Sequence, residues 1–403
     1  GYISLGKKLP EEFNYFKNNA GLNVYIYSDL MTSEELNVFL NRNDQSESVN
    51  INKFAFNFDS IEFLENNFLN VFGLLNLEKS NTSGEIFGNE LNLNFRSDKT
   101  GFTRFELINS KISNVEFINS KKNTFENAIN SRLIIKNSSI GKINIKEFDA
   151  YIVNSNKEFS INNIKLNSNL ISISPLNKKS NAYFSIKKDI PLYKLKGKFL
   201  IKDSKKIPLL NDFADFSYFN GSINLQWKDL STLSFIEGEM DFILKDLFLN
   251  YSSSNTVAFN LLGVLNLRNI LGKVANLDLS IDEFTSTQLS RVQGNFLLSE
   301  SKLRLSSPLF VETNTAKMKW IGQINKNYNN SLDELDLNLD LRIRVGENLP
   351  WYAAILGGLP AIAGSAVINE IFEEDINELT NYQYEVLGTI SKPKLRRINL
   401  NKE

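Results

Sequence analysis

The sequence predicts a mainly β protein. In the predicted fold, one long, twisted antiparallel sheet curls into an open hydrophobic groove (a β-taco), with a few short helices and a C-terminal apolar helical cap. Apolar and polar residues alternate with period two through nearly all of the chain before residue 346, which is typical of strands. Stretches rich in Asn, Ser, Asp and Gly, such as RSDKTG and NSSIGK, separate the runs and favour short turns. An uncharged segment from Asn348 to Asn369 then interrupts the alternation.

The clearest strand is DELDLNLDLRIRV, which ends at Val345. A strand of about 11 residues is roughly 36 Å long, which is more than a globular sandwich needs. One side of this strand is apolar and the other is polar, as in antiparallel sheets with one solvated face. The same alternation predicts strands around Phe54, Phe56, Phe58; Leu91, Leu93, Phe95; Ile143, Ile145; Ile223, Leu225, Trp227; Met240, Phe242, Leu244; Leu277, Leu279, Ile281; and Leu303, Leu305.

Few segments predict helices. TSEELNVFLNR opens with a capping box from Thr32 to Glu35, and the stretch that starts at Glu62 fits either a short helix or a strand with a turn. Short turns between the strands favour a meander. Two packed sheets would bury the apolar faces against each other, whereas a single curled sheet would leave its inner face for a ligand that is itself apolar.

The segment NLPWYAAILGGLPAIAGSAVINEIF, residues 348–372, fits a membrane span, a membrane-surface element or a piece of core. Its length suits a span, since about 20 apolar residues cross a bilayer. Gly357, Gly358 and Pro360 break it into two short helices, which argues against a span. Acidic residues on the second helix argue against capture by an anionic lipid surface. We therefore expect a broken apolar element that meets a membrane or lipid.

Composition excludes several classes of function. The chain of 403 residues has no histidine and no cysteine, so the commonest general base, thiol nucleophiles and the usual zinc ligands are missing. Its net charge of -1 provides no basic field for nucleic acid, and KPKLRR (392–397) is interpreted as a solvated tail. The acidic run 373–378 is interpreted as a solvated helix face, while Asp278 and Asp282 could form a carboxylate pair without a recognisable substrate site. We expect no catalytic residues, no metal and no cofactor.

From residue 221 onward the order of features resembles the C-terminal part of the YhdP group of AsmA-like proteins, which are bridge-like lipid transfer proteins. The resemblance rests on GSINLQWKDL, IEGEMDFILKDLFLN, the apolar stretch VAFNLLGVLNLRNILGKVANLDLSIDEF, and RVQGNFLLSESKLRLSSPLFVETNTAKMKWIGQIN. DLNLDLRIRV, the Gly- and Ala-rich apolar segment and the closing strand NYQYEVLGTISKPKL follow in the same order. Before residue 221, the chain resembles this family only in the general pattern of its strands.

This resemblance implies a periplasmic protein that carries phospholipid along a hydrophobic groove between the inner and outer membranes, without catalysis. It also implies an inner-membrane anchor ahead of this chain, which begins at Gly1 without methionine and is expected to be a piece of a longer protein. In that family the apolar segment caps the groove at the outer membrane, so the segment 348–379 would contact that membrane. We expect a monomer that binds no nucleic acid.

The predicted regions are a groove-forming part (1–220), an AsmA-like groove part (221–346), a helical cap (347–380), and a closing strand with a basic tail (381–403). Groove-lining residues are predicted to be Ile223, Leu225, Trp227, Met240, Phe242, Leu244, Leu277, Leu279, Ile281, Leu303, Leu305, Leu335, Leu337, Leu339, Leu341 and Ile343. Membrane-contacting residues are predicted to be Leu349, Trp351, Tyr352, Ile355, Leu356, Leu359 and Ile362. The alternative is a parallel β-helix adhesin or polysaccharide-acting protein, suggested by the Asn-rich stretch from about residue 108 to 170.

Overall fold

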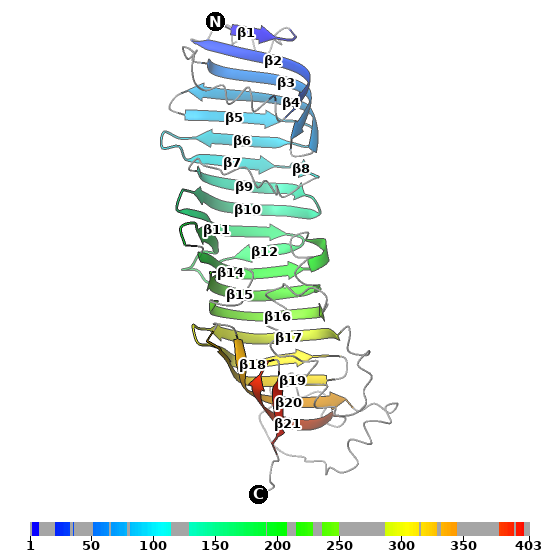
Figure 1. The fold of residues 1–403 in the computed structure, drawn as a ribbon. Coiled ribbons are helices and arrows are strands. Elements are labelled where there is room, and N and C mark those ends of the chain that lie inside the picture. The colour runs from blue at the N-terminus through cyan, green and yellow to red at the C-terminus, as the bar shows by residue number, and fades with distance from the viewer. Residues whose placement is uncertain are drawn as a thin grey trace. The chain divides into compact units, whose positions relative to one another are not determined.

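The computed structural model describes residues 2–7, 21–32, 35, 51–63, 66–78, 81–113, 129–190, 192–207, 215–228, 236–249, 287–313, 316–328, 332–344, 379–390 and 392–398. These residues form 22 strands assigned to one sheet, which confirms the mainly β prediction (Figure 1). Among the described residues, the one helical segment with an assigned first and last residue is the 3-10 turn η2 (Ser204–Lys206). The expected short helices and helical cap therefore find no support, and most of their residues lie outside the described ranges.

Two helix predictions have separate outcomes. The capping box is present, because the Thr32 backbone N–H donates to Glu35 Oε2 at 2.9 Å and the Glu35 N–H donates to Thr32 Oγ1 at 3.3 Å. The described residues of the stretch that starts at Glu62 are not helical, because they are the end of β3 (Ile51–Phe63) and most of β4 (Asn66–Glu78). Phe68, Val71 and Leu75 bury one side of β4, and this tertiary packing outweighs local helix propensity.

The chain divides into two compact units, each described by itself. Unit 1 comprises Gly1–Pro191 and Leu195–Lys198, and unit 2 comprises Leu192–Lys194 and Phe199–Glu403. Strand β14 (Leu192–Lys202) contributes residues to both units. The boundary expected after residue 220 lies inside β15 (Tyr218–Trp227).

Unit 1 is a sheet of mixed strand direction. Its strands are β1 (Tyr2–Leu5), β2 (Leu22–Thr32), β3 (Ile51–Phe63), β4, β5 (Asn81–Phe87), β6 (Asn92–Ser97), β7 (Thr103–Ile108), β8 (Lys111–Ile112), β9 (Ile129–Ile140), β10 (Ile143–Asn154), β11 (Glu158–Ser168), β12 (Ile171–Ser174) and β13 (Tyr183–Lys187). Antiparallel pairs join β3 through β7 in order, and β9 to β10, β10 to β11 and β11 to both β12 and β13.

The expected purely antiparallel meander is wrong for unit 1. β1 pairs with β2, β2 with β3, and β9 with both β7 and β8 in the parallel direction. A parallel pair needs a long crossover rather than a tight turn. Alternation with period two is the same for either direction, so it could not reveal these crossovers.

Unit 2 is an antiparallel meander as far as the structure describes it. β15, β16 (Glu237–Leu249), β17 (Thr287–Leu298), β18 (Lys302–Glu312), β19 (Ala316–Lys326), β20 (Leu332–Arg344), β21 (Leu379–Thr389) and β22 (Pro393–Arg397) pair in sequence order. Figure 1 shows the curvature of β20 and β21. The stretch 392–397 is not a solvated tail, because most of it forms β22, in which Pro393 is buried and Arg396 pairs with Glu385.

A bulge in β18 distorts this meander. Its register with β19 jumps between Arg304 and Leu309, and its register with β17 shifts opposite Asn295. Gly294 accommodates the displaced strand, because a Cβ on this glycine would lie 2.7 Å from Leu309 Cδ1 and 3.3 Å from Leu309 Cα. The bulge thus brings Leu309 against the neighbouring backbone while its side chain stays on the apolar side.

Candidate functional site

The register of unit 1 places the apolar residues of successive strands on one face. Phe95 lies opposite Phe105, Phe105 opposite Leu133, and Ile135 opposite Phe148. We call this surface the unit 1 face. It consists of Val24, Ile26, Phe54, Phe56, Phe58, Val71, Leu75, Ile86, Leu93, Phe95, Phe105, Leu107, Leu133, Ile135, Phe148, Ala150, Ile152, Ile161, Leu166 and Phe184, with Gly73 and Gly84 at two positions.

Exposure varies along the unit 1 face. At β3 and β4 it is closed, since Phe54, Phe56, Phe58 and Val71 are at most 3% exposed and the rings of Phe56 and Phe58 stack at 4.7 Å. From β6 onward most of the large apolar side chains are only half-buried, and they are Leu93, Phe95, Phe105, Leu133, Phe148, Ile161, Leu166 and Phe184. A contiguous apolar surface that stays accessible marks an interaction site more often than a packed core.

Unit 2 has a face of the same kind. Ile223 lies opposite Met240, Phe296 opposite both Met240 and Leu305, and Trp320 opposite Leu339. We call this surface the unit 2 face. It brings together twelve of the predicted groove-lining residues, namely Ile223, Leu225, Trp227, Met240, Phe242, Leu244, Leu303, Leu305, Leu335, Leu337, Leu339 and Leu341.

Sequence reasoning missed other members of the unit 2 face. Tyr193 stacks on Trp227 with ring centroids 5.8 Å apart and planes 10° apart. Phe219, Phe296 and Trp320 also lie on this face, opposite Leu244, Met240 and Leu339 respectively. Each occupies an apolar position of an alternating run, so the period itself could have identified them.

Other predicted residues cannot be assigned to the face. The side chain of Ile343 and all of Leu277, Leu279 and Ile281 lie outside the described residues, as do the predicted membrane-contacting residues from Leu349 to Ile362. The same holds for the carboxylates at 278 and 282 and for the acidic run 373–378. Their roles stay predictions.

Exposure also changes along the unit 2 face. Ile223, Leu225, Trp227 and Met240 are half-buried. From β17 to β20 the face is closed, and Val292, Leu309, Val311, Met318, Trp320, Leu339 and Leu341 are each 0% exposed. The prediction that these residues line one accessible groove stays untested, and the structure shows no uniform exposure along the face.

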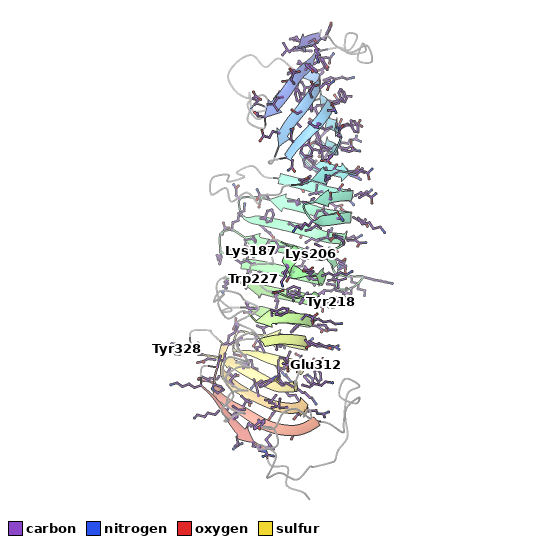
Figure 2. All side chains as sticks on the ribbon, turned by 90° about the vertical axis from the view of Figure 1, so that its right-hand side faces the viewer. Lys187, Lys206, Tyr218, Trp227, Glu312 and Tyr328 are labelled. Carbon is purple, nitrogen blue, oxygen red and sulfur yellow. The ribbon has the colours of Figure 1, made fainter. Side chains whose placement is uncertain are left out.

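Both described tryptophans carry a buried indole N–H. Neither Trp227 Nε1 nor Trp320 Nε1 has a hydrogen-bond acceptor within the part of the chain that the structure describes. Figure 2 shows Trp227 and Tyr218 at opposite ends of β15. A buried donor without an acceptor costs about 1–3 kcal/mol.

The opposite face of unit 1 is polar and forms ion pairs. Arg132 donates from Nε and Nη2 to the two carboxylate oxygens of Asp149 at 2.8 and 2.7 Å, and its guanidinium lies 5.2 Å from the ring centre of Tyr151. These hydrogen bonds hold the pKa of Asp149 below its ordinary value, although burial acts in the opposite direction. The pair joins β9 to β10 on the face away from the apolar residues.

A second polar cluster lies at β2 and β3. The hydroxyl of Tyr27 donates to Asp59 Oδ2 at 2.6 Å and lies 2.9 Å from Asp29 Oδ1. The hydrogen bond to Asp59 is the largest cause of a raised pKa for Tyr27. The ammonium of Lys7 lies 3.8 Å from the centre of the Tyr27 ring. The Tyr27 hydroxyl thus lies between two exposed carboxylates, and the Lys7 ammonium contacts the tyrosine.

The described residues form no metal site and no membrane-spanning helix. No group of three or more Asp or Glu side chains with a metal-binding arrangement occurs among the described residues. Within the same ranges, no helix is long and apolar enough to cross a bilayer. No family model, no curated protein and no solved structure matches this chain. The candidate site is therefore defined by geometry alone, as the accessible parts of the two apolar faces.

Proposed function

We propose that this chain is a non-catalytic lipid-transport protein of a cell envelope, which holds the acyl chains of phospholipids against its apolar faces and passes them between the inner and outer membranes. The observation that carries the proposal is the half-buried stretch of the unit 1 face from β6 to β13. Each strand there presents apolar side chains to one side, and their accessibility leaves room for an apolar ligand.

Charge supports an acyl chain as the occupant. Among the described strand residues from β5 to β13, the positions on the unit 1 face carry no charged side chain, whereas Arg104, Arg132 and Asp149 lie on the other face. A ligand on this face therefore finds no charged side chain with which to form an ion pair. Its binding has to come from apolar surface. Acyl chains do so at about 0.8 kcal/mol for each CH2 removed from water.

Uniformity supports movement rather than storage. Similar apolar side chains recur at each strand step of about 4.8 Å, so neighbouring positions on the face differ little in free energy. A chain held only by burial can slide along such a surface, because no directional bond has to break. The resemblance to the YhdP group of AsmA-like proteins supports the periplasm as the location, phospholipid as the cargo and a monomer as the working form.

The alternative of a parallel β-helix does not fit the described part of the Asn-rich stretch. β9 has parallel neighbours on one side, in β7 and β8, but β10 pairs antiparallel with both β9 and β11, whereas a β-helix would give it parallel neighbours. Antiparallel hairpins place Ile135, Phe148 and Leu166 side by side on the unit 1 face.

The proposal is tested by mass spectrometry of organic extracts from the chain purified in mild detergent. A soluble β-sandwich protein purified in the same way is the control. We expect phospholipid in excess of that control. An extract no richer in lipid than the control contradicts the proposal.

A pair of adjacent substitutions shows whether the lipid is on the unit 1 face. Leu93 is half-buried on this face, and Asn94 is the next residue, directed to the opposite face. Leu93→Asp should lower the amount of co-purified lipid, because a carboxylate disfavours an apolar neighbour. Asn94→Asp adds the same charge to the polar face and should leave the amount unchanged. Equal amounts in both variants would place the lipid elsewhere.

A further inference from the structure

We propose that acyl chains bound to unit 2 occupy only β15, the adjoining Tyr193 of β14 and the start of β16, and that Phe242 ends their path. This inference rests on the proposed function and divides the unit 2 face into a ligand-accessible part and a sealed part. The accessible part comprises Tyr193, Phe219, Ile223, Leu225, Trp227 and Met240. The sealed part begins at Phe242 and includes the apolar positions of β17 to β20.

The division is visible within one strand. Met240 and Phe242 are two residues apart on β16 and lie on the same face. Met240 is half-buried, whereas Phe242 is 4% exposed. On the next strand, Phe296 is 3% exposed and Val292 is 0% exposed. On this face the apolar residues of β15, including Phe219, are half-buried and those of β17 are buried, so accessibility ends within β16, where Phe242 follows Met240.

Phe242 is held in place by aromatic contacts and by two glycines. Its ring lies 6.4 Å from Phe219, with planes 16° apart, and 5.3 Å from Phe296, with planes 51° apart. Gly221 lies opposite Phe242 on β15, and Gly294 lies opposite it on β17. Neither glycine contributes a side chain on this face, so the ring can lie across the sheet between the accessible and the sealed part.

A hydrogen bond ties the end of β19 to the residue just before β16, on the Met240 side of Phe242. The ammonium of Lys326, at the end of β19, donates to the carbonyl of Ile236, just before β16, at 3.3 Å. β17 and β18 lie between these two strands in the pairing order, so this bond links strands three steps apart. Burial lowers the pKa of Lys326, which agrees with an ammonium that is partly removed from solvent.

Dense packing explains why the sealed part, at β17 to β20, excludes a ligand. Trp320, Leu337 and Leu339 are at most 1% exposed, and a Cβ on Gly322 would lie 3.1 Å from the Cα of Leu337. Protein interiors are packed about as densely as organic crystals, so an acyl chain could enter only by separating these side chains. The apolar surface that the acyl chain buries would then replace contacts that these side chains already make with one another, so entry would gain little free energy.

The tryptophans provide the test. Trp227 lies in the accessible part and Trp320 in the sealed part, four strand steps or about 19 Å apart along the sheet. Two full-length variants are compared, Trp351→Phe, which keeps both emitters, and Trp227→Phe/Trp351→Phe, which keeps only Trp320. Each is loaded with phosphatidylcholine that carries brominated acyl chains, a contact quencher of tryptophan fluorescence. Unbrominated phosphatidylcholine is the reference.

We expect brominated lipid to quench the part of the emission that Trp227 contributes and to leave the emission of Trp320 unchanged. Quenching of Trp320 in the variant without Trp227 overturns the inference but leaves the proposed function standing, because lipid would then reach the supposedly sealed part. Absence of quenching in both variants also overturns the inference, because no lipid then reaches unit 2, whereas the proposed function, which rests on the unit 1 face, fails only if no phospholipid co-purifies with the chain.

A substitution at Phe242 tests its role in ending the path. In the background that keeps only Trp320, Phe242→Ala should make the Trp320 emission sensitive to brominated lipid. Phe248→Ala is the matched control, since Phe248 is on the same strand but 39% exposed, and it should leave Trp320 insensitive. Circular dichroism identifies variants that fail to fold. If folded Phe242→Ala still protects Trp320, Phe242 does not end the path.

Discussion

The unit 1 face at β6 to β11 and the unit 2 face at β17 to β20 have the same alternation of apolar and polar residues in sequence, but their apolar side chains differ in exposure. Leu93, Phe105 and Leu133 alternate with polar residues in the same way as Leu335, Leu337 and Leu339. The first three are half-buried, and the last three are at most 4% exposed. Alternation thus determines which side of a strand is apolar, whereas the packing around the face determines whether that side is accessible. A ligand-binding surface and a core differ in the second property only.

The largest expected effect comes from placing a charge in each region. Leu339 lies between Trp320 and Tyr384 and is 0% exposed, whereas Leu133 lies between Phe105 and Ala150 and is half-buried. Leu339→Asp should destabilise unit 2 by about 3–5 kcal/mol or more, since it leaves a cavity and an unpaired buried charge. Leu133→Asp should cost less, because its carboxylate can reach water.

Urea unfolding followed by circular dichroism measures this difference. Asn338→Asp, on the polar face of the same strand, is the control for added charge. If Leu339→Asp and Leu133→Asp shift the unfolding midpoint equally, the two faces are not different environments.

A smaller effect is expected from filling the space at the β18 bulge. Gly294→Ala places a Cβ 2.7 Å from Leu309 Cδ1, and such overpacking typically costs about 1–3 kcal/mol. Leu309→Val shortens the clashing side chain, so the double variant should be more stable than the sum of the single effects predicts. Strict additivity in this cycle would show that the two residues do not touch.

The ion pair on the polar face of unit 1 should contribute about 1 kcal/mol or less, since both side chains are partly exposed. Because the pKa of Asp149 is lowered in the folded state, the contribution is present above the pKa of about 3.9 of an unfolded aspartate and is lost as the pH falls through the folded-state pKa.

Asp149→Asn tests this pH dependence. The variant should be less stable than the parent chain near neutral pH, and the two should converge in acid. Asp241→Asn, at an exposed position, is the control, and it should change the free energy of unfolding less than Asp149→Asn does. A stability difference for Asp149→Asn that persists in strong acid would assign the effect to packing rather than to charge.

The smallest effect is expected at the β19–β20 turn, where Tyr328 is 94% exposed (Figure 2). Tyr328→Ser should change the free energy of unfolding by less than about 0.5 kcal/mol. It should also leave the amount of co-purified lipid unchanged, since the residue belongs to neither face. A loss of lipid in this variant would extend the binding surface beyond the apolar faces.

The sequence predicted the strands and the composition of the faces well, because both follow from period two. It could not predict the parallel pairs of β2 with β3 and of β7 with β9, since strand direction depends on the path of long connections. The bulge that positions Leu309 was also missed, as no local residue pattern identifies it. The contact between Arg132 and Asp149 could have been found, because the predicted NSSIGK turn sets the register of β9 with β10.

We expect lipid to bind to the accessible part of the unit 1 face. Site-specific photo-crosslinking tests this binding most directly. Benzoylphenylalanine replaces Phe105, half-buried on the face, or Arg104, the preceding residue on the polar side. After irradiation of protein purified with its own lipid, mass spectrometry should find acyl-chain adducts at position 105 and far fewer at position 104. Equal yields at the two positions, or none at 105, would contradict the assignment of the ligand to this face.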